Sequence, residues 1–334
     1  MKKIIIFILT LLLSLNTFSQ KESNFWYFGN YAGLNFNPGA PVSIRDGEIS
    51  SNAGCASMSD RNGNLLFYTD GEKVYNKDHD IMLNGFTLKG NSKSTQSALI
   101  VPMPEDTKQY SPRKYYIFTT DVYNGTKGLR YSIVDMRLDH GKGGIESFNK
   151  DKLLLNLSAE KIASVIHNDC NSIWIVGLST IDGEKGEFDN LFDTYHSFLL
   201  TPSGIETNSI KTTFQRKYIG VGYMKASPRG SKLAAAHTNS KVFSIYDFDN
   251  ATGQLSNEVL FENSPNPYGV EFSKLGRHLF YSYPGGISQL RFGLNGALNG
   301  GSNIGGSSVT IGGALQMGSD GKIYRSLFYP RESH

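Results

Sequence analysis

The sequence has 334 residues, of which 19% are charged, and its formal net charge is +3. A nearly neutral chain without a dense run of Lys and Arg produces no broad positive field, so nucleic acid is excluded as a partner. Two cysteines, Cys55 and Cys170, are too few for the disulfide framework of a small secreted domain. Aromatic residues make up 12% of the chain and 36 residues are glycine, which favours an all-β fold with many tight turns.

The N-terminus predicts an export signal. Lys2 and Lys3 precede an apolar run at residues 4–15, and small or polar residues follow at 16–19. This order is typical of a secretory signal peptide, and the run is too short for a membrane-spanning helix, which needs about 20 residues. We therefore predict a signal peptide at residues 1–19 and an exported domain at 20–334. Loss of Lys2 and Lys3 takes the net charge from +3 to +1, and no transmembrane segment is expected in the mature chain.

Short strands separated by turn residues follow along the mature chain. The first two are expected at residues 25–28 and 33–36. A hairpin comes next, at 56–68, in which Ser59 precedes the turn and Gly63 supplies the positive φ that closes it. Five further segments repeat this pattern of strand, polar turn and strand: residues 97–119, 162–176, 224–234, 270–281 and 316–324.

The spacing of these hairpins predicts the architecture. Their turn centres recur at intervals of roughly 45 to 60 residues, which matches one four-stranded propeller blade with its loops. Two hairpins per unit make four antiparallel strands, and such sheets bury their apolar faces by standing side by side in a ring. We therefore predict a β-propeller of four-stranded antiparallel blades, because the rival β-sandwich would not explain the period. The second hairpins are expected at residues 131–145, 198–205, 243–255 and 290–298.

The predicted ring has an unfinished end. Six inner hairpins are legible, and the sixth unit stops after two strands, near residue 330. The N-terminal strands at 25–28 and 33–36 have no inner hairpin of their own, so they are expected to complete the last blade. The sequence also suggests an incomplete C-terminal blade and a seventh blade beyond His334, in a longer protein.

Several stretches of the sequence carry a family resemblance. They read WYFGNYAGLNF at 26–36, GCASMSDRNGNLLFYTDG at 54–71, GNSKSTQSA at 90–98, GLRYSIVDM at 128–136, GYMKASP at 222–228 and PYGVEFS at 267–273. In combination they resemble the N-terminal β-propeller regions of large exported proteins of the Bacteroidetes. Those proteins commonly end in a gliding-motility-associated or type IX secretion sorting domain. The resemblance implies a sorting domain downstream and delivery to the cell surface, and it carries over no active site.

Five residues are candidates for a ligand site at the mouth of the central channel. Lys225 and Glu271 each stand two residues before the turn serine in neighbouring units, so we expect them to face each other. Tyr223 and Tyr268 lie close to them in the sequence. His167 ends an inner strand and is expected to face the channel. The structural alternative for Lys225 and Glu271 is an ion pair between two blades.

No other pattern indicates catalysis or a cofactor. The seven histidines show no zinc-ligand spacing, and the sequence contains no phosphate loop, nucleophile elbow or dinucleotide fingerprint. We therefore expect no cofactor, no metal site and no catalytic residues. An exported protein permits a bridge between Cys55 and Cys170, but we favour two small buried hydrophobic side chains.

These observations favour an exported, non-catalytic binding or adhesion module. Long loops at 72–96, 103–113 and 181–193 would decorate a rigid disc, and loops on rigid scaffolds often carry recognition. The expected ligand is a glycan or a protein. The alternative is an extracytoplasmic hydrolase or lactonase with its site at the channel mouth, which three or more convergent ionisable groups would favour. A structural spacer in a large adhesin is the third possibility.

Overall fold

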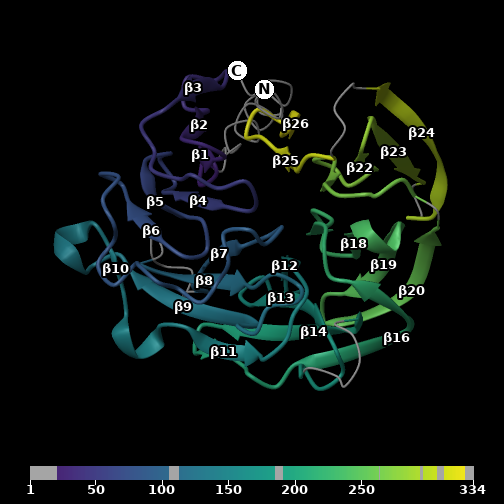
Figure 1. Cartoon of the computed structure of the whole chain (residues 1–334), viewed down its shortest axis with the longest axis horizontal. Helices are drawn as coiled ribbons and strands as arrows, with labels where there is room; N and C mark the ends of the chain where they lie inside the picture. The colour runs from purple at the N-terminus through teal and green to yellow at the C-terminus, as the bar shows by residue number, and fades with distance from the viewer. Residues whose placement is uncertain are drawn as a thin grey trace, which may run out of the picture.

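The protein folds as a ring of β-sheets (Figure 1). The computed structural model describes residues 21–104, 113–184, 191–262, 264–293, 296–306 and 312–327. The predicted signal peptide at 1–19 lies outside the described residues. Within the described residues no helix has both the length and the apolar character needed to cross a bilayer.

All six predicted inner hairpins are present, each as an antiparallel pair. Each pair starts one blade of the β-propeller. The pairs are β4 (Ala56–Ser59) with β5 (Leu65–Thr69), β7 (Ala98–Pro102) with β8 (Lys114–Thr120), β12 (Ile162–Ile166) with β13 (Ile173–Ser179), β17 (Met224–Ala226) with β18 (Lys232–His237), β21 (Val270–Phe272) with β22 (His278–Tyr283), and β25 (Leu315–Met317) with β26 (Ile323–Arg325).

The predicted outer hairpins complete most of the blades. We number the blades 1 to 6 by their inner strands β4, β7, β12, β17, β21 and β25. Blades 4 and 5 have four strands, blades 2 and 3 have five, blade 1 has three, and blade 6 has two among the described residues. The outer strands are β6 (Val74–Asn76), β9 (Leu129–Asp135), β10 (Gly144–Ile145), β11 (Lys152–Leu155), β14 (Leu191–Thr201), β15 (Gly204–Ile205), β16 (Ile210–Ile219), β19 (Val242–Asp249), β20 (Gln254–Phe261), β23 (Gly286–Phe292) and β24 (Leu298–Gly306).

Glycine closes four of the six inner hairpins, as the sequence predicts. Gly63, Gly230, Gly276 and Gly321 have φ values of 88°, 67°, 69° and 79°, a region that costs other residues energy. Outside the sheets, the described part of the chain has three 3₁₀ turns: η1 (Asp139–Gly141), η2 (Ser147–Asn149) and η3 (Thr238–Ser240).

The hydrophobic core is divided among the gaps between neighbouring blades. Between blades 3 and 4, for example, Trp174 and Tyr195 pack with Leu233 and Tyr246 in one buried cluster. Equivalent clusters join blades 1 and 2, blades 2 and 3, and blades 4 and 5. Each inner strand therefore hides both faces by standing between two neighbours, which is the packing that the repeat predicts.

The N-terminal strands close the ring in a different way from the one expected. They form their own three-stranded sheet of β1 (Phe25–Phe28), β2 (Ala32–Asn35) and β3 (Val42–Ile44), which is not paired with β25 or β26 in the described chain. On one face, Tyr27 stacks on Tyr68 of blade 1 at 4.3 Å. On the other, Trp26 meets Tyr324 of blade 6 edge-on at 5.6 Å. Aromatic side chains on both faces make this sheet fill the gap between blades 6 and 1.

Candidate functional site

The inner strands all begin at one end of the ring, where polar residues gather. The residue directly before β4, β7, β12, β17 and β21 is respectively Cys55, Ser97, Lys161, Tyr223 and Gly269. Hydrogen bonds join these strand starts to one another. Ser97 Oγ donates to Gly54 O, and Tyr223 N–H donates to Tyr268 O at 2.9 Å. This end is therefore a network across several blades.

A short segment before β7, residues 94–97, reaches across the inside of the ring, and we call it the strap. Its Gln96 amide contacts two inner strands at once. Nε2 donates to Ile162 O at 2.9 Å and to Met224 O at 3.2 Å. Oε1 accepts N–H groups from Met224 at 2.8 Å and Ile162 at 3.3 Å. The strap thereby links blade 2 to blades 3 and 4, although its residues 94–96 were expected to belong to a loop that decorates the disc.

Glu160 fixes the strap from the next blade. Its side chain is buried, and Oε2 accepts both the N–H of Thr95 at 2.8 Å and the Thr95 hydroxyl at 2.7 Å. Oε1 accepts the N–H of Tyr123 at 3.1 Å. The carboxylate is thus occupied by neutral donors and serves to position the strap.

Replacing Glu160 by glutamine should lower the free energy of unfolding by about 1–2 kcal/mol. The amide group faces three donors with a single acceptor oxygen, so at least one buried N–H loses its partner. Urea unfolding of the Glu160→Gln variant measures this effect. Glu206→Gln is the control, because Glu206 is exposed. Equal stability of the two variants would contradict the positioning role.

Lys161 is fully buried, and its side-chain nitrogen lies in a cage of backbone carbonyls. Its Nζ lies 3.2, 3.0 and 2.9 Å from the oxygens of Gly220, Val221 and Gly222, and 2.8 Å from Ala236 O. Burial lowers the pKa of Lys161 to about 7, and the charge of Glu160 partly opposes that shift. The cage ties the start of blade 3 to two segments of blade 4.

His237 lies beside this cage and is also fully buried. Its Nε2 is 2.8 Å from Ser244 Oγ, while Nδ1 has no hydrogen-bond partner. Burial, reinforced by the charges of Lys161 and Arg216, keeps the pKa of His237 well below its ordinary 6.5. His237 is therefore a neutral ring at neutral pH.

The predicted facing of Lys225 and Glu271 is confirmed. Lys225 Nζ lies 3.4 Å from Glu271 Oε2 and donates to Gln316 Oε1 at 2.6 Å. Oε2 of Glu271 also accepts the N–H of Met317 at 3.1 Å, and Oε1 accepts the N–H of Phe272 at 3.0 Å. Lys225, Glu271 and Gln316, which we call the inner-strand cluster, come from the neighbouring inner strands β17, β21 and β25. In this ion pair the Lys225 side chain is 22% exposed and the Glu271 side chain is 10% exposed.

Tyr223 and Tyr268 lie at the starts of these strands, as predicted. Their rings meet edge-on at 5.5 Å, and both are partly buried. Burial raises the pKa of both hydroxyl groups, so both are neutral at physiological pH. The two rings therefore pack against each other near the strap end of β17 and β21, and Tyr223 also packs against the core cluster between blades 4 and 5.

His167 is not near this cluster, which corrects the prediction that it faces the channel. It follows β12, at the end of that strand remote from the strap. The ring lies 3.2 Å from Ala251 O in the β19–β20 turn, accepts the N–H of Asp169 at 3.1 Å, and lies 5.7 Å from the ring of Trp174. These contacts place His167 between the turns of two blades.

The two cysteines are free, so the structure contains no bridge between them. Cys55 is partly buried, whereas Cys170 is exposed in the β12–β13 turn with a φ of 58°. The expectation of two buried side chains was therefore wrong for Cys170.

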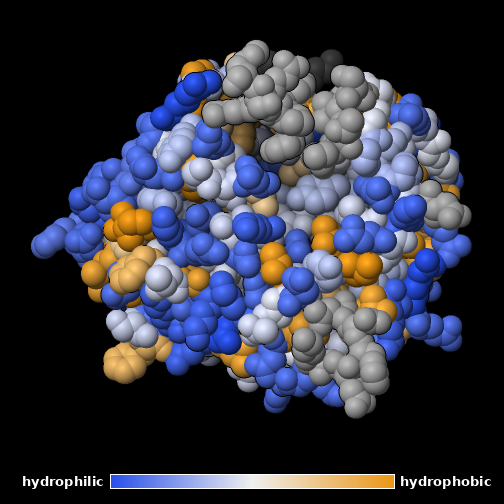
Figure 2. All heavy atoms as spheres, in the orientation of Figure 1, coloured by the Kyte–Doolittle hydropathy of each residue, from blue (hydrophilic) through white to orange (hydrophobic). Residues whose placement is uncertain are grey.

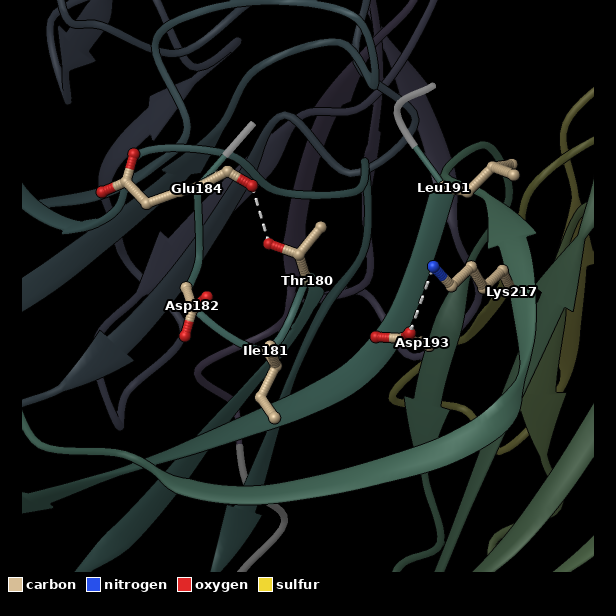
Figure 3. A pocket seen from close by; sticks show the side chains of 7 residues that line it. All are labelled: Thr180, Ile181, Asp182, Glu184, Leu191, Asp193 and Lys217. Carbon is tan, nitrogen blue, oxygen red and sulfur yellow. Dashed lines mark hydrogen bonds and ion pairs between the residues drawn. The ribbon is translucent and has the colours of Figure 1, made fainter. Parts of the chain in front are cut away.

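A pocket of about 270 Å³ lies in blade 3, where β13 ends, β14 begins and β16 ends (Figure 3). Its charged residues are Asp182, Glu184, Asp193 and Lys217, and Lys217 Nζ lies 4.0 Å from Asp193 Oδ2. In the described ranges no three His, Cys, Asp or Glu side chains are grouped so that they could hold a metal ion.

Sequence reasoning missed the strap, Glu160 and Lys161. The signal available was the pair Glu160-Lys161 directly before an apolar strand, since two charged residues there must be paired or exposed. The polar sequence at 94–97 gave no sign of its direction, because its partners are mostly backbone atoms far away in the chain.

No protein-family model and no curated protein matches this sequence. Solved structures do. A putative 6-phosphogluconolactonase from Bacteroides fragilis has a TM-score of 0.52 at 12% identity, over 90% of this chain and 85% of that one. A protein from Lactobacillus plantarum has a TM-score of 0.48 at 13% identity, over 84% of this chain and 81% of that one. A periplasmic gluconolactonase from Pseudomonas aeruginosa has a TM-score of 0.45 at 15% identity, over 75% of this chain and 69% of that one. The chain shares the β-propeller fold. At these identities the likeness shows the fold alone.

Proposed function

We propose that the protein is an exported propeller that binds a neutral, polyhydroxylated ligand, such as a glycan, at the inner-strand cluster. The observation that carries the proposal is the meeting of Lys225, Glu271 and Gln316 from three neighbouring inner strands, with the ion pair partly exposed. An ammonium, a carboxylate and an amide side by side supply donors and acceptors for several hydroxyl groups. The pair has no net charge, so a charged ligand would leave one partner without its counter-charge. Tyr223 and Tyr268, which shortly precede Lys225 and Glu271 in the chain, are the aromatic residues that would contact a sugar ring.

Export and surface delivery are part of this proposal. They rest on the charged, apolar and small segments at residues 1–19 and on the family resemblance of the sequence. If the complete gene is expressed, recovery of a protein that lacks residues 1–19 outside the cytoplasm would support them. Retention of an uncleaved chain in the cytoplasm would contradict them.

Binding to an immobilised array of neutral oligosaccharides tests the ligand proposal. We expect Lys225→Met and Glu271→Gln to lose at least about tenfold in affinity, because each removes a charged hydrogen-bond partner. Lys232→Met is the matched control, because Lys232 also forms an ion pair, 2.6 Å from Asp247, but the pair joins β18 to β19 instead of two inner strands. No binding by the native chain, or equal binding by all variants, would overturn the proposal.

Lactone hydrolysis at the same cluster is the second candidate. The structural neighbour described as a putative 6-phosphogluconolactonase suggests it, and Glu271 would act as the general base beside the Lys225 ammonium. Both Glu271 oxygens already accept backbone N–H groups, which leaves fewer lone pairs free to contact a water molecule or a substrate. For this reason we place binding first. Acid release from glucono-1,5-lactone that Glu271→Gln abolishes and Lys232→Met retains would reverse this order.

A further inference from the structure

One flank of the ring carries large apolar side chains that remain exposed in the described chain. Leu83, Phe86 and Phe148 are 46%, 57% and 90% exposed, and we call them the apolar flank. Figure 2 shows hydrophobic side chains on the lower left side of the molecule, where Figure 1 places β10 and β11. Single exposed hydrophobic residues are common, whereas groups of them mark contact surfaces.

The backbone beneath the apolar flank is held by hydrogen bonds between two segments that are distant in the sequence. Ile145 N–H donates to Leu83 O at 2.9 Å, and Asn84 Nδ2 donates to Ile145 O at 3.0 Å. Lys150 Nζ donates to Phe86 O at 2.7 Å and lies 5.1 Å from the centre of its ring. The flank is thus a fixed surface that presents these side chains outward.

Basic residues border the apolar flank: Lys89, Lys150 and Lys152. Two carboxylates lie near them. Glu146 is paired with Lys114 at 2.6 Å, and Asp151 accepts the N–H of Lys89 at 2.8 Å. With Glu146 neutralised, the border has an excess of positive charge.

The shape of the flank indicates its partner. The Phe148 side chain is 90% exposed, so it projects from the surface and no groove of the described chain surrounds it. A fluid acyl layer covers such a side chain on all sides without needing a matching pocket, and lysines at its edge meet phosphate groups. We propose that the apolar flank inserts Phe86 and Phe148 into the interface of a lipid bilayer that contains anionic lipid. Because the whole chain is nearly neutral, the two rings supply most of the binding and the lysines orient it.

Cosedimentation with vesicles tests the proposal. The native chain is expected to bind vesicles of phosphatidylcholine with phosphatidylglycerol more strongly than vesicles of phosphatidylcholine alone. The double variant Phe86→Ser/Phe148→Ser should lose at least about tenfold in affinity for the mixed vesicles, since it removes two aromatic rings from the acyl layer. Leu275→Ser is the matched control, because Leu275 is 64% exposed in the β21–β22 turn of another blade. The control should bind like the native chain.

A second readout locates the contact. In Phe148→Trp the new indole should shift its fluorescence to shorter wavelength when the mixed vesicles are added, as an aromatic ring does on leaving water. Failure of the native chain to bind either vesicle, or equal binding by the double variant, would overturn the proposal. Self-association of the native chain that the double variant loses would assign the flank to a second copy instead, and would overturn it as well.

Discussion

Replacing Lys161 by methionine is expected to lower the free energy of unfolding by about 3 kcal/mol or more. Methionine fills much of the same volume but donates no hydrogen bond, so four buried carbonyl oxygens lose the side-chain nitrogen between them. Urea unfolding measures the loss, with Lys322→Met as the control, because Lys322 is 76% exposed. A loss no larger than that of the control would contradict the role of the cage.

The same lysine predicts a pH dependence in the native chain. Its pKa is about 7 in the folded state and 10.5 ordinarily. Between these values the unfolded chain holds a proton that the folded chain has released, so the contribution of Lys161 to stability rises with pH from about 7 to 10.5 and is lost as the pH falls to 7. The difference in unfolding free energy between the native chain and Lys161→Met should therefore grow over this window. A constant difference would contradict a lowered pKa.

Replacing Gln96 by leucine should lower the free energy of unfolding by roughly 2–4 kcal/mol. Leucine is similar in size, but the backbone N–H and C=O groups of Ile162 and Met224 lose the amide that joins them. Gln254→Leu, at an exposed position of β20, provides the control.

Amide hydrogen exchange gives a second, local readout of this variant. Faster exchange at Met224 and Ile162 than in the native chain is expected, since the strap no longer covers these N–H groups. Unchanged exchange at both positions would show that the strap does not fasten blades 3 and 4.

The repeat carried most of the information about the fold. A turn serine followed by glycine, with β-forming residues on both sides, located four of the six inner hairpins, because the chemistry of a tight turn depends on a few neighbouring residues. The hairpins at 97–119 and 162–176 were predicted only from two apolar strands on either side of a polar segment. The facing of Lys225 and Glu271 followed from the same register. Ring closure was predicted less well, because the choice between pairing with β26 and packing against it depends on tertiary contacts such as Trp26 with Tyr324.

The residues around the strap show the limit of sequence reasoning at the site. Gln96 contacts a strand 128 positions later, and its partners there are backbone atoms that any residue supplies. His167 was misplaced for a related reason: the end of an inner strand was inferred, but the turn that it contacts belongs to another blade. Long-range contacts to the backbone leave no residue pattern to detect.

The edge-on contact of Trp26 with Tyr324 has an optical consequence. The chain has two tryptophans, and Trp174 belongs to the cluster between blades 3 and 4, so the two indoles report on separate parts of the ring. During synthesis the first sheet must wait for the last hairpin before this junction can form. The emission of Trp26, recorded in a chain whose other indole is replaced, is therefore a direct monitor of the final step of assembly.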